Sequence, residues 1–185
     1  MQLDLSLYLV TDRNLTLNRP LLEVVEQAVK GGVTVVQLRE KDCSSKAFFE
    51  EAIKLKKLLS TYDIPLIIND RLDIALAVDA EGLHIGQHDI PYPIARKLLG
   101  KDKIIGLSVE SLKDLEVANR WDVDYIGLSP VFDTSTKTDT ATALGLEGVR
   151  ELTRFSKQHS VGIGGIDRFN AASTIQAGAD GLAVV

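Results

Sequence analysis

The sequence has few of the features that mark secreted, membrane or nucleic-acid-binding proteins. Its single cysteine, Cys43, has no partner for an internal disulfide, which is typical of proteins from a reducing compartment. No apolar run approaches the ~20 residues of a membrane-spanning helix, and the first residues lack the pattern of a secretory signal. The formal net charge is −5, so bulk electrostatics do not favour nucleic acid or an anionic membrane. We expect a cytoplasmic protein that binds neither.

What is present is the composition of a folded globular protein. Of the 185 residues, 45% are hydrophobic and 25% are charged, which excludes a disordered chain, a collagen-like fibre and a disulfide-rich mini-protein. The length suits one domain, at roughly 100–200 residues per domain. No linker or long repeat divides the chain, so we expect a single domain over residues 1–185.

Short apolar runs rich in isoleucine, valine and leucine recur along the whole chain. Because these runs are continuous rather than alternating with polar residues, they predict strands buried on both faces, as in parallel sheets covered by helices. The eight runs begin at Leu7, Val33, Pro65, Gly82, Ile104, Tyr125, Ser160 and Gly181.

The segments between these runs have the apolar spacing of helices. The segment from Ser44 to Ser60 shows it best, and another begins after Pro20 and ends at Gly31. Eight strands alternating with helices predict a (β/α)8 TIM barrel, in which the final helix is absent because the chain ends within the eighth strand at Val185. An open doubly wound sheet is the alternative, but eight strands are hard to fit into one open sheet at this length.

Two cations follow the second predicted strand. Strand side chains alternate between faces, so Gln37, Arg39 and Lys41 share one side. If that side faces the barrel interior, the cations stand at the carboxyl end of the strand, where barrel active sites are built. The fork of arginine and the point charge of lysine suit phosphate oxygens. A solvated strand end without function is the alternative.

Carboxylates follow the next two predicted strands. The third strand ends in Asn69 and Asp70, and Asp89 follows the fourth. Two carboxylates at adjacent strand ends can share a metal, and oxygen-only ligation favours Mg²⁺ over zinc. The alternative for Asp70 is a helix N-cap. His84 and His88 lie on a strand and its loop, and we do not expect them to form a zinc pair.

The later strands add candidates for binding phosphate. Ser108 lies near the carboxyl end of the fifth strand, and a polar segment with one lysine, Lys137, begins at Asp133. Long loops without helix or strand periodicity are often binding loops or lids. Gly164 and Gly165 follow the seventh strand, where glycine lets the backbone approach a phosphate and a helix beginning at Asp167 would offer free N–H groups.

These motifs together resemble the thiamine phosphate synthase family. The motifs follow one another in the order typical of the family, from Tyr8 to the end of the chain. The resemblance rests on QLREK at Gln37, the Asn69–Asp70 pair, GQHD ending at Asp89 and TSTK ending at Lys137, which are jointly specific although none suffices alone.

The resemblance implies a transferase. It would join 4-amino-5-hydroxymethyl-2-methylpyrimidine diphosphate to a thiazole phosphate, or its carboxylated form, and release thiamine phosphate and diphosphate by a dissociative mechanism. Asp70 and Asp89 would bind Mg²⁺. Arg39, Lys41, Lys137 and Ser108 would carry the catalysis. The pyrimidine diphosphate would contact Gln37, Leu38, Arg39, Glu40, Lys41, Asn69, Ser108 and Lys137. The thiazole phosphate would contact Thr134, Ser135, Thr136, Gly165 and Val185.

The sequence departs from the family pattern in the sixth loop and leaves two other functions open. Ser129 and Asp133 stand where the family commonly has glycine and proline. A thiazole tautomerase on the same scaffold would have a histidine at the position of Glu110, which disfavours that reading. A non-catalytic barrel that binds a phosphate ligand would not need both carboxylates and both lysines. Cys43 is expected only to pack, since the proposed chemistry uses no thiolate.

Overall fold

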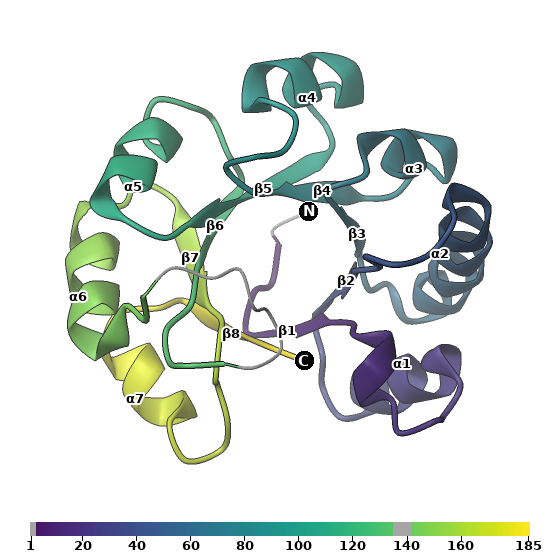
Figure 1. Ribbon diagram of the computed structural model, residues 1–185, viewed down its shortest axis with the longest axis horizontal. Helices are drawn as coiled ribbons and strands as arrows, with labels where there is room; N and C mark the ends of the chain where they lie inside the picture. The colour runs from purple at the N-terminus through teal and green to yellow at the C-terminus, as the bar shows by residue number, and fades with distance from the viewer. Residues whose placement is uncertain (1–2, 135–141) are drawn as a thin grey trace.

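Eight parallel strands close into a barrel in the computed structural model, which describes residues 3–134 and 142–185 (Figure 1). Each strand pairs with its neighbours in chain order, and β1 pairs with β8 through Leu7 and Leu182, which excludes the open sheet. The predicted barrel is therefore confirmed. The strands are β1 (Leu7–Val10), β2 (Val35–Leu38), β3 (Leu66–Asn69), β4 (Gly82–Ile85), β5 (Ile104–Val109), β6 (Tyr125–Leu128), β7 (His159–Gly162) and β8 (Gly181–Val184).

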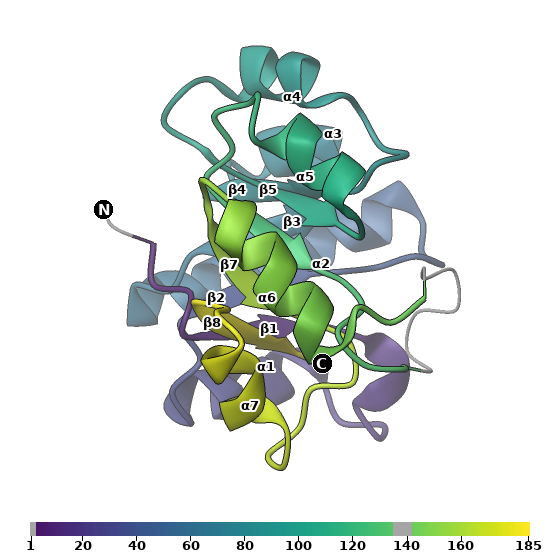
Figure 2. The same cartoon turned by 90° about the vertical axis from the view of Figure 1, so that its left-hand side faces the viewer.

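Helices surround the barrel, and α6 and α7 lie outside β7 and β8 (Figures 1 and 2). No helix within the described ranges is long and apolar enough to cross a membrane. One residue, Val185, follows β8, and α7 packs beside that strand. The helices are α1 (Leu21–Lys30), α2 (Ser45–Leu59), α3 (Leu72–Ala77), α4 (Tyr92–Leu99), α5 (Leu112–Ala118), α6 (Gly145–Phe155) and α7 (Ala171–Gln176), with short 3-10 turns at Arg13–Leu15 and Ser60–Tyr62.

Both faces of the strands are buried, which explains their continuous apolar runs. On β2, Val36 and Leu38 point outward into the layer between strands and helices, and Val35 points inward. The barrel interior is a smaller cluster that includes two aromatic rings, Tyr8 and Tyr125. Successive residues of one strand therefore contribute to two separate cores.

One predicted helix start is wrong. The helix α7 begins at Ala171, not after Asp167, because the Asp167 carboxylate instead accepts the N–H groups of Phe169 and Asn170 at 2.7 and 3.1 Å and closes a turn. Gly165 therefore lies in the loop after β7 and not at a helix N-terminus. The helix α5 has a side-chain N-cap at Ser111, whose hydroxyl accepts the Asp114 N–H at 3.2 Å.

Candidate active site

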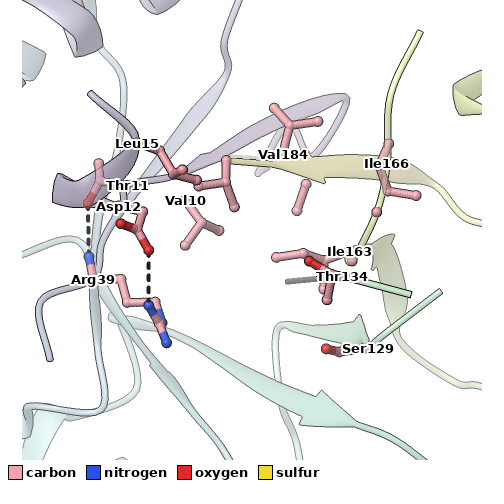
Figure 3. Close-up of a pocket in the computed structure, with 14 residues that line it drawn as sticks. Val10, Thr11, Asp12, Leu15, Arg39, Ser129, Thr134, Ile163, Ile166 and Val184 are labelled. Atoms are coloured by element: carbon pink, nitrogen blue, oxygen red, sulfur yellow. Dashed lines mark hydrogen bonds and ion pairs between the residues drawn. The ribbon is translucent and has the colours of Figure 1, made fainter. Parts of the chain in front are cut away.

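Two adjoining cavities open at the carboxyl ends of the strands. The first, of about 260 Å³, is lined mainly by residues at the ends of β2 to β5. The second, of about 210 Å³, is lined mainly by residues that end β1, β7 and β8 (Figure 3). Five residues line both cavities, so a ligand in one would lie beside a ligand in the other. The shared residues are Val10, Arg39, Ser129, Ile163 and Ala183.

Arg39 and Lys41, which follow β2, line the first cavity and interact with residues at neighbouring strand ends. The backbone N–H of Arg39 donates to the Thr11 hydroxyl at 3.1 Å, and its guanidinium lies 3.7 Å from the Asp12 carboxylate (Figure 3). The Lys41 ammonium lies 2.6 Å from the Asp70 carboxylate. Because Arg39 borders both cavities, one positive group can act on anions in either.

Asp70 and Asp89 form a carboxyl pair in the first cavity. Burial is the largest single influence on the pKa of Asp70 and raises it, but the hydrogen bonds from Lys41 and Asp89, together with nearby positive charge, leave the pKa lowered. Burial raises the pKa of Asp89, and the adjacent Asp70 charge raises it further, although the Gly86 N–H donates to Asp89 at 2.7 Å. The pair therefore has one carboxylate held ionised by a cation and a second that is costly to ionise beside it.

This donor set fits Mg²⁺. Asp70 and Asp89 offer hard oxygen ligands beside cations that suit phosphate, and Mg²⁺ usually takes one or two carboxylates with water and substrate phosphate completing its shell. No cluster of three or more histidine, cysteine or acidic side chains with metal-binding geometry occurs in residues 3–134 and 142–185, so a closed protein cage is not formed there. His84 and His88 both line the cavity, but no such cluster includes them.

Neutral polar groups line the inner part of the first cavity. Gln37 and Asn69 are buried at 4% and 9% exposure. The Ser108 hydroxyl lies 2.9 Å from His84 Nε2, and the Gln87 amide donates to the Ser108 carbonyl at 2.7 Å. The sequence marks His84 only as a candidate metal ligand and does not show that it lies beside Ser108. Alternation along β4 is the sequence signal for the face of His84, and the structure pairs it with Asn69 of β3.

The second cavity has a largely apolar wall and a glycine loop whose backbone can lie close to a bound ligand. Ile163, Val184 and Val185 line it, together with Thr134 (Figure 3). Gly165 has φ +62°, and a Cβ there would lie 2.7 Å from the Asp133 carbonyl oxygen, so the loop requires glycine at this position. The cavity therefore suits a small apolar ring carrying a group that hydrogen-bonds to backbone.

Comparisons with known proteins agree with this geometry. The family model described as thiamine monophosphate synthase matches residues 7–185. The chain belongs to this family. It is 53% identical over 182 residues to a thiamine-phosphate synthase of Syntrophomonas wolfei, covering 98% of this chain and 87% of the relative. A Clostridium acetobutylicum protein of the same name is 52% identical, covering 98% and 86%. The solved thiamine phosphate pyrophosphorylase of Pyrococcus furiosus superposes with a TM-score of 0.88 at 37% identity, covering 99% and 86%.

The structure brings most residues suggested by the thiamine monophosphate synthase resemblance to the two cavities. Leu38 and Glu40 are the exceptions. The Leu38 side chain is fully buried in the outer core, and the Glu40 carboxylate accepts from Arg13 at 2.7 Å, so neither side chain lines a cavity. Ser135, Thr136 and Lys137 lie outside the described residues. The residues that line a cavity are Gln37, Arg39, Lys41, Asn69, Asp70, Asp89, Ser108, Thr134, Gly165 and Val185.

Proposed function

We propose that this chain is a thiamine-phosphate synthase, a transferase that joins 4-amino-5-hydroxymethyl-2-methylpyrimidine diphosphate to a thiazole phosphate. The observation that carries the proposal is the pair of adjoining cavities. One presents two cations and two carboxyls, as a diphosphate with Mg²⁺ requires, and the other suits a small ring with a phosphate. Both substrates would then meet across the shared wall that includes Arg39.

In this assignment the first cavity receives the pyrimidine diphosphate. Arg39 and Lys41 bind the diphosphate oxygens, and Gln37 and Ser108 face the pyrimidine ring. Asp70 and Asp89 would hold Mg²⁺, which when bound supplies positive charge to the leaving diphosphate. The Lys41–Asp70 ion pair would keep both groups at the cavity before substrate arrives.

The remaining residues of the family motifs complete the assignment. Gly165, Thr134 and Val185 border the second cavity, where the thiazole phosphate would bind. By resemblance, Ser135 and Thr136 would join them, and Lys137 would reach the diphosphate. Any contribution from Leu38 or Glu40 would come from the backbone, because their side chains point elsewhere.

The reaction then needs no nucleophile or general base from the protein. The bond between the exocyclic carbon and the diphosphate oxygen breaks, and its electron pair leaves with the diphosphate. The thiazole nitrogen donates its lone pair to the resulting pyrimidinyl-methyl cation and forms the new carbon–nitrogen bond. Arg39 and Lys41 interact more strongly with the departing diphosphate than with the ester, so they stabilise the transition state selectively.

The decisive experiment mixes the purified protein with both substrates, with Mg²⁺ and with EDTA, and measures diphosphate and thiamine phosphate separately. We expect equal amounts of the two products, and only with Mg²⁺. Conversion between thiazole phosphate tautomers without the pyrimidine substrate would instead indicate the isomerase. Binding of the pyrimidine diphosphate without any diphosphate release would indicate a binding protein.

A further inference from the structure

A continuous line of hydrogen bonds crosses the barrel interior beneath the first cavity. The Gln37 amide donates to the Tyr8 hydroxyl at 2.8 Å, and that hydroxyl lies 2.6 Å from the Tyr125 hydroxyl. The Tyr125 hydroxyl lies 3.0 Å from His84 Nδ1, and His84 Nε2 lies 2.9 Å from the Ser108 hydroxyl. Four of these side chains line the first cavity, and only Tyr125 does not: the four are Gln37, Tyr8, His84 and Ser108. We call these five side chains the interior relay.

The two tyrosines of the relay bury hydroxyl groups, which costs free energy and is not needed for packing. Tyr8 and Tyr125 are 1% and 0% exposed, and burial raises the pKa of both phenols, so both remain neutral hydroxyls. A phenylalanine would fill nearly the same space without a polar group to satisfy. Their hydroxyl groups therefore serve the relay itself.

The neighbouring strands leave room for the rings of the relay. A Cβ at Gly106 would lie 2.1 Å from Tyr125 Cζ, and one at Gly127 would lie 3.3 Å from His84 Cε1. The rings of Tyr8 and Tyr125 meet edge to face with centroids 5.7 Å apart. Since the surrounding backbone is shaped to these side chains, their hydroxyl and imidazole groups are held in one arrangement.

The hydrogen bonds of the relay fit one direction. Because the Gln37 amide donates to Tyr8, the Tyr8 hydroxyl can donate to Tyr125, and Tyr125 can donate to Nδ1 of His84. The imidazole then carries its proton on Nε2 and donates to Ser108. In this direction the Ser108 hydroxyl accepts from His84 and can donate its own hydrogen to a ligand in the cavity, and each of the five side chains keeps a partner.

We propose that Tyr8, Tyr125 and His84 are positioning residues for the pyrimidine half of the reaction. Tyr8 fixes the conformation of Gln37, and Tyr125 fixes the tautomer of His84. His84 in turn orients Ser108, so that its hydroxyl presents a hydrogen-bond donor to a ring nitrogen of the aminopyrimidine. The proposal rests on the proposed function. It adds that specificity for the pyrimidine depends on Tyr125, which lines neither cavity, acting through Tyr8 and His84, which border the first.

The kinetic test removes one hydroxyl at a time. Tyr8→Phe and Tyr125→Phe should each lower kcat/KM for the pyrimidine diphosphate roughly fivefold or more, while the KM for the thiazole phosphate stays within about twofold. Tyr92→Phe is the matched control, because its buried hydroxyl bonds the Asp122 carbonyl outside both cavities. That variant should keep both kinetic parameters. Loss of thermal stability in the Tyr8 and Tyr125 variants with unchanged kinetics would refute the proposal.

The double variant tests whether the two hydroxyls act as one unit. If both belong to one relay, Tyr8→Phe with Tyr125→Phe should lose no more activity than the worse single variant. Losses that multiply would show independent effects and refute the relay.

Nitrogen-15 NMR of the His84 side chain tests the direction without any turnover. We expect the proton on Nε2 in the wild-type protein and loss of that preference in Tyr125→Phe. A proton on Nδ1 in the wild type would overturn the proposal. Wild-type protein that forms no thiamine phosphate would refute the proposed function, whereas active wild type with unaffected tyrosine variants would refute the relay alone.

Discussion

Asp89 allows the role of the carboxyl pair to be separated from its effect on folding. Asp89→Asn keeps the size of the side chain and an oxygen that can accept the Gly86 N–H now bonded at 2.7 Å. It removes the negative charge beside Asp70 that the proposed Mg²⁺ site requires. The variant should therefore lose activity while folding normally.

The expected magnitudes differ enough to be distinguished. A neutral acceptor weakens the hydrogen bond from Gly86 by about 1 kcal/mol, and this loss is opposed by relief of the repulsion that raises the pKa of Asp89. The net change in stability should stay within about 1 kcal/mol, or about 2–4 °C in Tm for a chain of this size. Loss of one group that stabilises developing charge costs about 10²–10³ in rate. The activity loss should thus far exceed the stability loss.

The assay measures turnover against Mg²⁺ concentration and thermal unfolding with and without Mg²⁺. Asp124→Asn is the matched control, because Asp124 also accepts a backbone N–H at 2.7 Å, from Ile105, but lines neither cavity. The control should lose stability through its weakened ion pair with Arg96 and keep wild-type turnover. Wild-type turnover in Asp89→Asn, or full wild-type turnover in EDTA, would refute the metal assignment.

Three further predictions address other parts of the site. Arg39→Ala should lower kcat/KM for both substrates about 10- to 100-fold, because the charged group borders both cavities; a loss confined to one substrate would contradict this. Gly165→Ala should raise the KM for the thiazole phosphate several-fold, whereas Gly100→Ala, which has a similar positive φ but open space around its Cβ, should change only thermal stability. Cys43→Ser should retain near-normal turnover, and a collapse in rate with the fold intact would revive covalent catalysis.

The barrel was predictable because its evidence is local and repeated. Each strand is a short apolar run, and buried parallel strands need such runs on both faces. The closure of β1 on β8 followed from the number of strands and not from any single residue. The start of α7 was not predictable, because an aspartate closes a turn as readily as it caps a helix, and the choice at Asp167 depends on the loop that precedes it.

The cations and carboxylates of the site were predictable for the same reason. Arg39, Asp70 and Asp89 follow successive strands, and the carboxyl ends of parallel strands meet at one end of a barrel. Their presence in one cavity agrees with that reasoning, and their roles stay predictions. Strand alternation places Glu40 on the side opposite Arg39, but its ion pair with Arg13 was not predictable, because the pair depends on how two loops meet.

The interior relay lies beyond what local patterns reveal. Tyr8 and Tyr125 are 117 positions apart and each sits in an apolar run, so the sequence identifies them only as core residues. Their hydroxyls meet only when the barrel closes. Helix and strand periodicity report which face a residue occupies, but not which residue it meets across the interior.

The carboxyl pair and the relay share a physical property that separates them from the rest of the barrel. Each places polar groups where burial disfavours them, as the raised pKa values of Asp89 and Tyr8 record. Most of the interior around them is apolar. Folding alone would be served as well by apolar residues of similar size at these positions. Polar groups held at this cost beside two substrate-sized cavities are better explained by the chemistry at the mouth of the barrel than by its stability.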